Sequence, residues 1–370
     1  MLSYKWTYPS DTFYVLGNTL SSDKIAAFDL DHTLIIPKSG KKFPIDRNDW
    51  RWWNKCIPRK LIKLYSQGYK IVIFTNQAGI EKGKLDKREF TRKVKYIINA
   101  LEIPIQVFVA SAEDHYRKPF TTMWDYMVKK CNNNIEIDQS NSFYCGDAAG
   151  RTNDFSVSDR KFASNIKLTF HTPEEYFLHE TPCKFSWSSV DPHSIPTIDI
   201  DNDKIYAKKH QEMIIMVGKP ASGKSSFAER YFVSNNYVRV NRDTLKTIPK
   251  CKKLVRESLD EGLSVIIDNT NGSRKQRSEF IELAADIPIR CFYLTTSQEI
   301  CNHLNYVRVK ETHGKVRRIP DVAYRIYNKN FEVPKKSEGF DKVIKIDFQA
   351  NLDNKGLKKI FLQFTPEGIK

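Results

Sequence analysis

Short apolar runs, each ending in polar or glycine residues, recur along this chain. They occupy residues 24–31, 69–75, 105–110 and 142–145, and later 212–218, 237–240, 264–268 and 289–294. Brief apolar runs bounded by turn residues are typical of buried parallel strands. Stretches with helical periodicity lie between them, for example 59–67, 87–101, 121–131 and 226–232. Strands that alternate with helices predict an α/β protein with two domains, each built on a doubly wound parallel sheet.

A proline- and serine-rich stretch with little periodicity separates the two sets of strands. It predicts a linker at residues 181–204, between a first domain at 24–180 and a second at 205–370. Residues 1–23 are too few for another folded domain, so we expect an extension or an added strand there.

The amino-acid composition excludes some classes of protein and favours others. With 40% hydrophobic residues, the 370-residue chain can fill real cores, which excludes general disorder. Sixty Lys and Arg residues against 44 Asp and Glu give a net charge of +16, which favours polyanionic partners. The seven cysteines are scattered, as in proteins of reducing compartments. Without a signal peptide or a membrane-length apolar run, we expect a soluble, intracellular protein.

The first chemical motif follows residues 24–28. Asp29 and Asp31 are two positions apart where this strand ends, so both carboxylates lie on one side of an extended chain. Adjacent carboxylates repel unless a cation joins them, which predicts Mg²⁺ as their companion. The alternative is that these aspartates merely cap a turn. It is disfavoured because polar groups suited to phosphate chemistry also follow the next strands.

Three such groups occur. Thr75-Asn76 offers a hydroxyl for a phosphoryl oxygen, Arg117-Lys118 offers cations, and Asp147 offers a further metal carboxylate. This order resembles the haloacid-dehalogenase phosphohydrolase superfamily. The resemblance implies that Asp29 attacks phosphorus, that Asp31 is the general acid and base, and that Thr75 and Lys118 assist. It also implies that Asp29, the Asp31 carbonyl and Asp147 hold Mg²⁺.

The second motif is a phosphate-binding loop. Residues 218–225 match G-x-x-x-x-G-K-[ST] between an apolar strand and a helix-like stretch, which is the context that the motif requires. Lys224 is expected to bridge the β- and γ-phosphates of ATP, and Ser225 to ligate Mg²⁺. The predicted ATP-binding residues are Gly218, Lys219, Pro220, Ala221, Ser222, Gly223, Lys224, Ser225 and Ser226.

Residues beyond this loop indicate what receives the γ-phosphate. Asp243 follows the next strand and is placed to accept a proton from an attacking hydroxyl, although it also suits a helix N-cap. The dense cationic stretch 308–318 suits a lid over the phosphates, with Arg308 at its start; an ordinary solvated loop is the alternative.

A phosphatase followed by a phosphate-loop kinase resembles the eukaryotic polynucleotide kinase 3'-phosphatase family of DNA strand-break repair. The resemblance is carried by FDLDHTLI, IFTNQAGIEKGKL, RKPFTTMWD, GDAAGR, DFSVSDRKFA, GKPASGKSSF, VNRDTLK and IIDNTN. It implies that Asp243 is the kinase base and Arg308 a lid arginine. The substrate-binding residues expected are Asn76, Lys82 and Arg117 in the phosphatase, and Arg242, Lys246 and Arg277 in the kinase.

The chain departs from the family pattern at several positions. His32 stands where the family usually has Gly, Lys82 where it often has Arg, and Tyr306 in a slot that is commonly basic. Whether Asp154 or Asp159 supports the phosphatase metal is open at this point. The forkhead-associated domain of vertebrate members is not expected in residues 1–23.

The sequence as a whole predicts a monomeric, nuclear, bifunctional enzyme that heals DNA ends. It would remove 3'-phosphates and phosphorylate 5'-hydroxyls with ATP and Mg²⁺, acting on nicked, gapped or broken strands. A repair ligase or a scaffold protein is a conceivable partner, and no membrane is expected. The alternatives are RNA or tRNA end healing, a DNA-end-binding scaffold with decayed sites, and a metabolite phosphatase fused to a small-molecule kinase. The short intervals between the phosphatase motifs disfavour the last, because they leave no room for a large cap domain.

Overall fold

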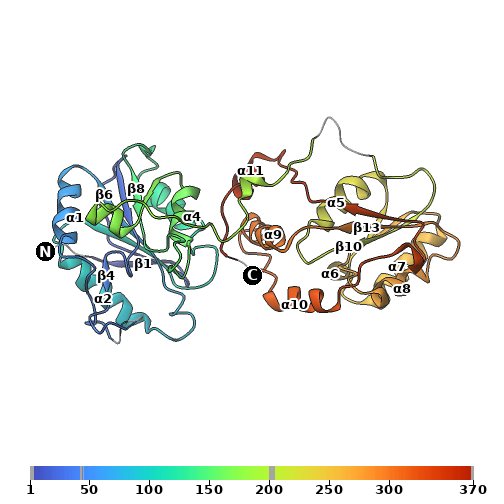
Figure 1. Cartoon of the computed structure of the whole chain (residues 1–370), viewed down its shortest axis with the longest axis horizontal. Coiled ribbons are helices and arrows are strands. Elements are labelled where there is room, and N and C mark those ends of the chain that lie inside the picture. The colour runs from blue at the N-terminus through green and yellow to red at the C-terminus, as the bar shows by residue number, and fades with distance from the viewer. Residues whose placement is uncertain (1–3, 42–43, 45, 200–204, 368–370) are drawn as a thin grey trace. The chain divides into compact units, whose positions relative to one another are not determined.

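A computed structural model of the chain describes residues 4–41, 44, 46–199 and 205–367 (Figure 1). These residues form two compact units. The first unit runs to Asp191 and also includes Gln363–Glu367, whereas the second unit comprises Pro192–Leu362.

This division differs from the predicted boundaries in two ways. The predicted linker is shared between the units, since residues up to 191 belong to the first and those from 192 to the second; residues 200–204 lie outside the described residues. The five residues Gln363–Glu367, predicted to belong to the second domain, instead join the first unit.

The first unit is built on a seven-stranded sheet of order β1-β2-β7-β6-β3-β8-β9. The five strands from β7 to β9 are parallel, but β1 and β2 form a hairpin that pairs antiparallel with β7. The strands from residues 24–180 thus form a parallel sheet as predicted, and residues 1–23 supply added strands, which pair antiparallel. The strands are β1 (Trp6–Ser10), β2 (Phe13–Leu16), β3 (Ile25–Phe28), β6 (Lys70–Asn76), β7 (Ile105–Ala110), β8 (Phe143–Cys145) and β9 (Thr169–His171).

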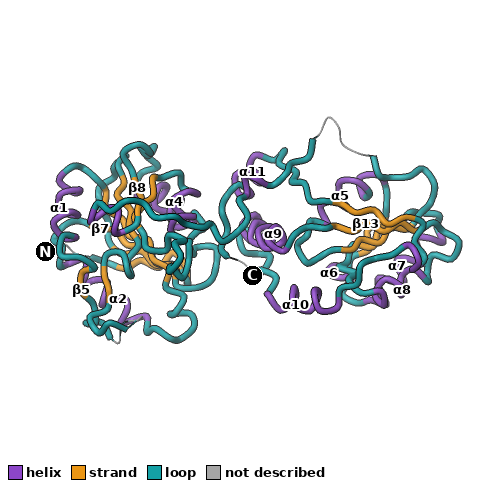
Figure 2. The backbone as a smooth tube through the Cα atoms, viewed as in Figure 1, coloured by secondary structure: helices purple, strands orange, loops and turns teal. Residues whose placement is uncertain are grey.

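Apolar clusters cover both faces of this sheet, and for this reason its central strands are continuous apolar runs. Figure 2 shows the helices around it. They are α1 (Ile57–Ser66), α2 (Lys87–Asn99), α3 (Thr122–Tyr126) and α4 (Ser158–Asn165), with π-helical turns η1 (Met127–Cys131) and η2 (Glu174–Leu178). A small ribbon pairs β4 (Ile35–Ile36) with β5 (Arg51–Trp52).

The second unit has a five-stranded, entirely parallel sheet of order β11-β12-β10-β13-β14, as predicted. Its strands are β10 (Met213–Val217), β11 (Val238–Val240), β12 (Val265–Ile267), β13 (Ile289–Leu294) and β14 (Lys342–Ile346). All five residues of β10 are buried, so the strand that leads into the phosphate-binding loop is the centre of the sheet.

The remaining elements of the second unit surround this sheet. The helices are α5 (Lys224–Tyr231), α6 (Arg242–Leu245), α7 (Ile248–Asp260), α8 (Arg274–Ile281), α9 (Gln298–Glu311), α10 (Asp321–Asn330) and α11 (Lys355–Phe361). The described residues of this unit also form the 3₁₀ turns η3 (Pro192–Ser194), η4 (Val233–Asn235) and η5 (Lys336–Glu338). Among the described residues, none of the helices combines the length and apolarity needed to cross a membrane.

Candidate active sites

Two neighbouring parallel strands of the first unit bring the predicted carboxylates together. β3 and β8 align with Phe28 opposite Cys145, and the backbone N–H of Asp29 donates to the Cys145 carbonyl at 2.9 Å. Asp29 and Asp147 therefore leave the sheet at the same edge, beyond the carboxyl ends of the strands. The Thr33 hydroxyl links the two loops, because it donates to Asp147 Oδ1 and accepts from the Asp147 backbone N–H.

Lys118 is the buried cation at the centre of this site. Its ammonium group donates to Asp29 Oδ1 at 2.5 Å, Asp159 Oδ1 at 2.8 Å, the Tyr144 hydroxyl at 2.8 Å and the Phe74 carbonyl at 2.7 Å. This set of partners fixes the ammonium beside the predicted nucleophile.

Asp159, and not Asp154, is the additional carboxylate of the site. Oxygens of Asp29, Asp147 and Asp159 lie within 4.8 Å of one another. Asp159 also accepts from the Ala148 N–H at 3.0 Å, and a Cβ on Gly146 would come within 2.5 Å of its carboxylate, so only glycine fits there. Asp154 instead binds Arg151 and nearby backbone N–H groups.

Burial dominates the electrostatics of this cluster. It raises the pKa of Asp29 to about 7, although the Lys118 ammonium opposes the shift. Burial, followed by the charges of Asp29 and Asp159, raises the pKa of Asp147 well above its usual range. For Lys118, burial alone would lower the pKa, but Asp159 and Asp29 outweigh it and raise the pKa. These raised pKa values mean that one lysine does not fully stabilise the ionised carboxylates, and a divalent cation would favour their ionised forms.

Asp31 lies at the open side of the site, with 36% of its side chain exposed against 11% for Asp29. Gln77 Nε2 donates to Asp31 Oδ2 at 2.6 Å and to the Thr75 hydroxyl at 2.9 Å. The Lys93 ammonium lies 3.6 Å from the other oxygen, Oδ1. Both oxygens of the expected general acid are therefore held by neighbouring side chains.

The sequence did not point to Lys93 or Tyr144. Lys93 is 3% exposed on the buried face of α2, between Phe90 and Val94. A lysine at a core-facing position of an amphipathic helix was the available signal. Tyr144 lies in the buried strand β8, where an aromatic residue resembles ordinary core.

The structure places the three predicted phosphatase substrate-binding residues differently. Both ends of the Asn76 amide bind the backbone of Lys118, at 2.9 and 3.2 Å, so Asn76 positions the lysine. Lys82 forms an exposed ion pair with Glu113 at 2.5 Å. The Arg117 side chain has no hydrogen bond or ion pair within the described part of the chain, so its guanidinium is available.

His32 occupies a backbone conformation that favours glycine. Its φ is +60°, in the left-handed region, and its N–H donates to the Ile35 carbonyl at 2.7 Å as the chain turns back. This geometry explains why the position suits Gly, and it shows that histidine keeps the turn at some cost.

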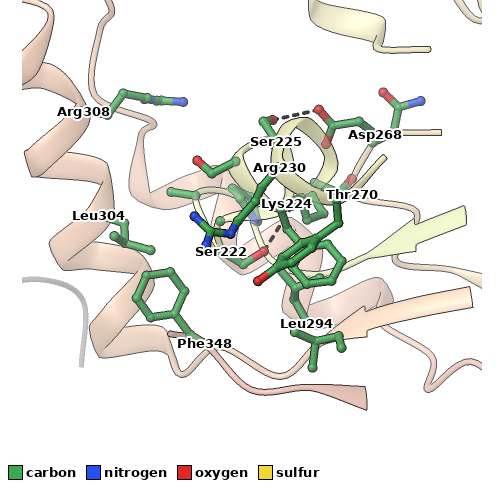
Figure 3. A pocket seen from close by; sticks show the side chains of 18 of the residues that line it. Ser222, Lys224, Ser225, Arg230, Asp268, Thr270, Leu294, Leu304, Arg308 and Phe348 are labelled. Atoms are coloured by element: carbon green, nitrogen blue, oxygen red, sulfur yellow. Dashed lines mark hydrogen bonds between the residues drawn. The ribbon is translucent and has the colours of Figure 1, made fainter. Parts of the chain in front are cut away.

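In the second unit, the phosphate-binding loop lies between β10 and α5, and Lys224 is the first residue of α5. The Lys224 ammonium donates to the carbonyls of Gly218 at 2.9 Å and Lys219 at 2.6 Å. It also donates to the Ser222 hydroxyl at 3.3 Å (Figure 3). Burial lowers the pKa of Lys224 to about 8, opposed by Asp268 and Asp243. The helix N-terminus and the loop together form an anion site.

Ser225 and Asp268 form a second polar pair beside this loop. The Ser225 hydroxyl donates to Asp268 Oδ2 at 2.8 Å, as Figure 3 shows. Arg239 donates to the same oxygen through Nε at 2.8 Å and Nη2 at 2.6 Å. A hydroxyl beside a carboxylate is a donor set that suits Mg²⁺.

A cavity of about 1200 Å³ joins the loop to the other predicted kinase residues. Its lining includes Ser222 to Ser226, Arg242 and Asp243, and Arg308. In Figure 3, Arg308 and Leu304 of α9 and Phe348 face the loop from the opposite side. The Arg308 Nε is buried and has no hydrogen-bond partner within the residues described, whereas Nη2 donates to Asn305 Oδ1 at 3.4 Å and to the Arg317 carbonyl at 3.3 Å.

The part of the cavity near Asp243, where the 5'-hydroxyl strand was predicted to bind, differs in some details from the prediction. Asn241 caps α6 by accepting from the N–H groups of Asp243 and Thr244, so Asp243 is not the N-cap and its carboxylate is exposed. The Lys246 ammonium donates to the Asp243 carbonyl at 2.5 Å. Arg318, at the far end of the predicted lid, pairs with Asp321 and lies 5.0 Å from the Tyr306 ring, so Tyr306 has a role in seating an arginine.

Arg277 does not belong to the substrate site, which corrects that prediction. It is 0% exposed, and both ends of its guanidinium bind the Glu338 carboxylate, at 2.7 and 2.8 Å. Its Nη1 donates to the carbonyls of Asn271, Gly272 and Glu332. Arg277 therefore ties the loop after β12 to η5.

Similar proteins confirm the resemblance inferred from the motifs. The family model described as polynucleotide kinase 3 phosphatase matches residues 24–177, and an AAA domain model matches residues 247–334. A bifunctional polynucleotide phosphatase/kinase of Schizosaccharomyces pombe is 38% identical over 360 residues, which cover 95% of this chain and 86% of that protein. The chain belongs to the bifunctional polynucleotide phosphatase/kinase family.

Family members differ in how much of this chain they match. A polynucleotide 3'-phosphatase of Arabidopsis thaliana is 42% identical over 172 residues, 42% of this chain and 24% of that protein. The chain is accordingly an enzyme with a phosphatase in its first unit and a kinase in its second. The sequence-based predictions of fold class and of both activities are confirmed.

Proposed function

We propose that this enzyme heals DNA strand breaks by removing 3'-phosphates and phosphorylating 5'-hydroxyls with ATP. The main support is that one chain combines the buried Asp29–Lys118–Asp159 cluster with a complete phosphate-binding loop next to Asp243. A break with a 3'-phosphate and a 5'-hydroxyl needs these two reactions before a ligase can join it.

In the phosphatase reaction, an Asp29 oxygen attacks phosphorus and the bond to the 3'-oxygen breaks. Asp31 gives its proton to that leaving oxygen, so a neutral 3'-hydroxyl departs and Asp29 carries the phosphoryl group. Asp31 then takes a proton from water, which attacks the aspartyl-phosphate and releases inorganic phosphate. Lys118 offsets the negative charge beside Asp29 throughout.

The residues of this site fit Mg²⁺. Asp29, Asp147 and the Asp31 carbonyl would hold it, with Asp159 near enough to contribute, and the clustered carboxylates lack positive charge. When bound, the ion supplies charge neutralisation for the phosphoryl group.

In the kinase reaction, Asp243 accepts the proton of the 5'-hydroxyl, whose oxygen attacks the γ-phosphorus as the bond to the β-phosphate oxygen breaks. Lys224 and Arg308 offset the charge on the phosphates, and the loop N–H groups orient them. Ser225 and Asp268 would hold Mg²⁺ here. Arg242 lines the cavity next to Asp243, where it is placed to hold the acceptor strand.

DNA is the favoured substrate by family resemblance. The net charge of +16 supports a phosphate backbone as partner. The exposed side of Asp31 supports access by the end of a polymer. Such a role would place the enzyme in the nucleus, with a repair ligase acting on its product.

The test is a nicked duplex with 3'-phosphate and 5'-hydroxyl ends, incubated with Mg²⁺, with and without ATP. We expect loss of the 3'-phosphate in both reactions and 5'-phosphorylation only with ATP. A matched RNA nick should react at least tenfold more slowly; faster reaction of RNA would assign the enzyme to RNA repair. Reaction of neither end would leave a binding scaffold as the better reading.

A further inference from the structure

The segment Gln363–Glu367 follows the whole second unit in the sequence, yet it packs as part of the first. Three of its residues, Gln363, Phe364 and Thr365, are at least nine-tenths buried. The first unit is thus made of two separate pieces of chain, and the second piece lies outside residues 24–177, where the phosphatase family match falls.

The segment is fastened to the middle and to the C-terminal end of α4. The Asn165 amide makes a reciprocal pair with Phe364: Oδ1 accepts from its N–H at 2.7 Å, and Nδ2 donates to its carbonyl at 2.9 Å. The Lys161 ammonium, on a fully buried side chain, donates to the Thr365 carbonyl at 3.0 Å. Each of these contacts satisfies a backbone group that would otherwise be buried without a partner.

Glu367 reaches the other end of the same helix. The N-cap residue of α4 is Val157, whose side chain cannot accept a hydrogen bond. Glu367 Oε1 accepts from the Val157 N–H at 2.8 Å and lies 3.3 Å from the Ser156 hydroxyl. A carboxylate at a helix N-terminus also interacts favourably with the helix dipole. The next N–H groups of α4 have nearer partners, since Ser158 donates to the Ser156 hydroxyl and Asp159 to the Ala148 carbonyl. Glu367 therefore adds, from a distant part of the chain, the acceptor for the N-cap residue's own N–H.

Two further contacts hold the segment in place. Phe364 stacks on Trp187 with ring centroids 4.1 Å apart and planes at 14°. Burial lowers the pKa of Lys161 to about 8, and the nearby charge of Glu367 opposes the shift, so Glu367 also attracts the Lys161 ammonium of α4.

The helix that the segment holds carries an active-site residue. Asp159 is in the first turn of α4 and accepts from Lys118 and from Tyr144, whose hydroxyl is 3.0 Å away. A shift or fraying of that turn moves Asp159, and with it the ammonium beside Asp29.

We infer that Gln363–Glu367 is a positioning segment for the phosphatase reaction: by capping and clamping α4 it sets Asp159 and Lys118 in place. The kinase precedes the segment in the chain, but the phosphatase depends on it. This inference rests on the proposed phosphatase chemistry at Asp29.

The experiment compares the full chain with a variant that ends after Leu362, and with a control that ends after Glu367. Hydrolysis of p-nitrophenyl phosphate reports the chemistry at Asp29 without any nucleic acid, and a 3'-phosphorylated oligonucleotide reports the proposed function. Transfer of phosphate from ATP to a 5'-hydroxyl oligonucleotide reports the kinase. Hydrogen exchange of residues 157–165 reports α4 independently of any activity.

We expect the Leu362 variant to lose about tenfold or more in phosphatase kcat with little change in KM, because the segment does not touch substrate. Its kinase rate should stay within about twofold, and α4 should exchange faster. The control should match the full chain. A synthetic peptide of residues 361–370, added at high concentration, should restore part of the phosphatase rate.

If the shortened chain folds poorly, point variants of the full chain can still test the inference. Glu367→Gln weakens the cap and should lower phosphatase kcat less than Phe364→Ala does, with the kinase unaffected in both. Unchanged phosphatase rates in the truncation and both point variants would overturn the inference, as would equal losses of phosphatase and kinase. A full-length chain that hydrolyses p-nitrophenyl phosphate but not the oligonucleotide would instead refute the proposed substrate, with the α4 comparison still valid.

Discussion

At the scale of single residues, the electrostatics of the phosphatase site depend on the small number of positive charges close to its carboxylates. Lys118 serves Asp29 and Asp159 together, while Lys93 lies beside Asp31. Lys118 is placed to stabilise charge near the proposed nucleophile, and Lys93, with Gln77, holds the carboxylate of the proposed acid.

Lys93→Met should selectively impair substrates that need a proton for their leaving group. The Asp31 carboxyl would lose the partner of Oδ1 and turn away from the leaving oxygen. We expect kcat/KM for a 3'-phosphorylated oligonucleotide to fall about tenfold, with little change for p-nitrophenyl phosphate, whose leaving group departs unprotonated. Lys93→Arg should retain most of the rate. Equal losses on both substrates would show that Lys93 has only a structural role.

His32→Gly should stabilise the first unit. Glycine adopts a φ of +60° without a Cβ clash, and this gain exceeds its larger entropy in the unfolded chain. We expect the free energy of unfolding to rise by about 0.5 kcal/mol in urea titrations. His32→Ala keeps the Cβ and serves as the control, with no gain expected; a loss in the glycine variant would mean that the imidazole contributes more than the turn costs.

At the scale of elements, helix ends and strand ends determine where the functional groups lie. α8 begins with a capping box, in which Ser273 accepts from the Gln276 N–H and Gln276 accepts from the Ser273 N–H. Local sequence thus starts α8, whereas the first N–H groups of α4 bind both nearby residues and the distant Glu367.

Ser273→Ala should lower the stability of the second unit by about 1 kcal/mol, because a backbone donor at the start of α8 loses its acceptor. Ser278→Ala, in the middle of the same helix, should change it far less. Urea unfolding followed by loss of kinase activity measures both, and the phosphatase rate should be the same in the two variants. A Ser273 effect no larger than that of Ser278 would contradict the capping argument.

Lys70, the first residue of β6, should make stability depend on pH in the alkaline range. Burial lowers its pKa from 10.5 to about 8, so between these values the folded chain holds fewer protons than the unfolded chain. The free energy of unfolding should therefore rise with pH from 8 to 10.5, relative to Lys70→Met, by on the order of 2 kcal/mol. A difference between the two proteins that stays constant over this range would contradict the prediction.

Much of the fold and of both sites could be predicted because the motifs are local. A few consecutive residues are enough to recognise a strand that leads to Asp29 or Asp147, or a phosphate-binding loop that leads to Lys224. Lys93, Tyr144 and Asp159 were not assigned because their roles depend on which helix face or neighbouring strand meets the site. Arg277 was predicted to bind substrate, but it is buried in the structure, and residue type alone does not show whether a side chain is buried. The placement of Gln363–Glu367 has no local pattern at all.

At the scale of the whole molecule, two chemistries share one chain without sharing side chains. The phosphatase groups lie in the first unit, and the residues that line the kinase cavity lie in the second. Substitutions at either nucleophile or base should therefore separate the activities.

Asp29→Ala should abolish 3'-phosphatase activity and leave the kinase intact, because it removes the carboxylate that we propose forms the bond to phosphorus. Asp243→Ala should lower the kinase rate by about 100-fold or more and spare the phosphatase. On a nick with both unligatable ends, an equimolar mixture of the two variants should heal both ends, as followed by gel electrophoresis. Loss of both activities from either substitution would refute two independent sites.

The return of the chain to α4 also has a consequence for synthesis in the cell. Domains generally fold as they leave the ribosome, N-terminal parts first, but here the earlier unit waits for five residues that are translated after the later one. The kinase can therefore mature while the phosphatase is still incomplete. A premature stop codon between these two points would yield a protein that adds 5'-phosphates yet leaves 3'-phosphates in place, and so produces breaks that remain closed to ligation.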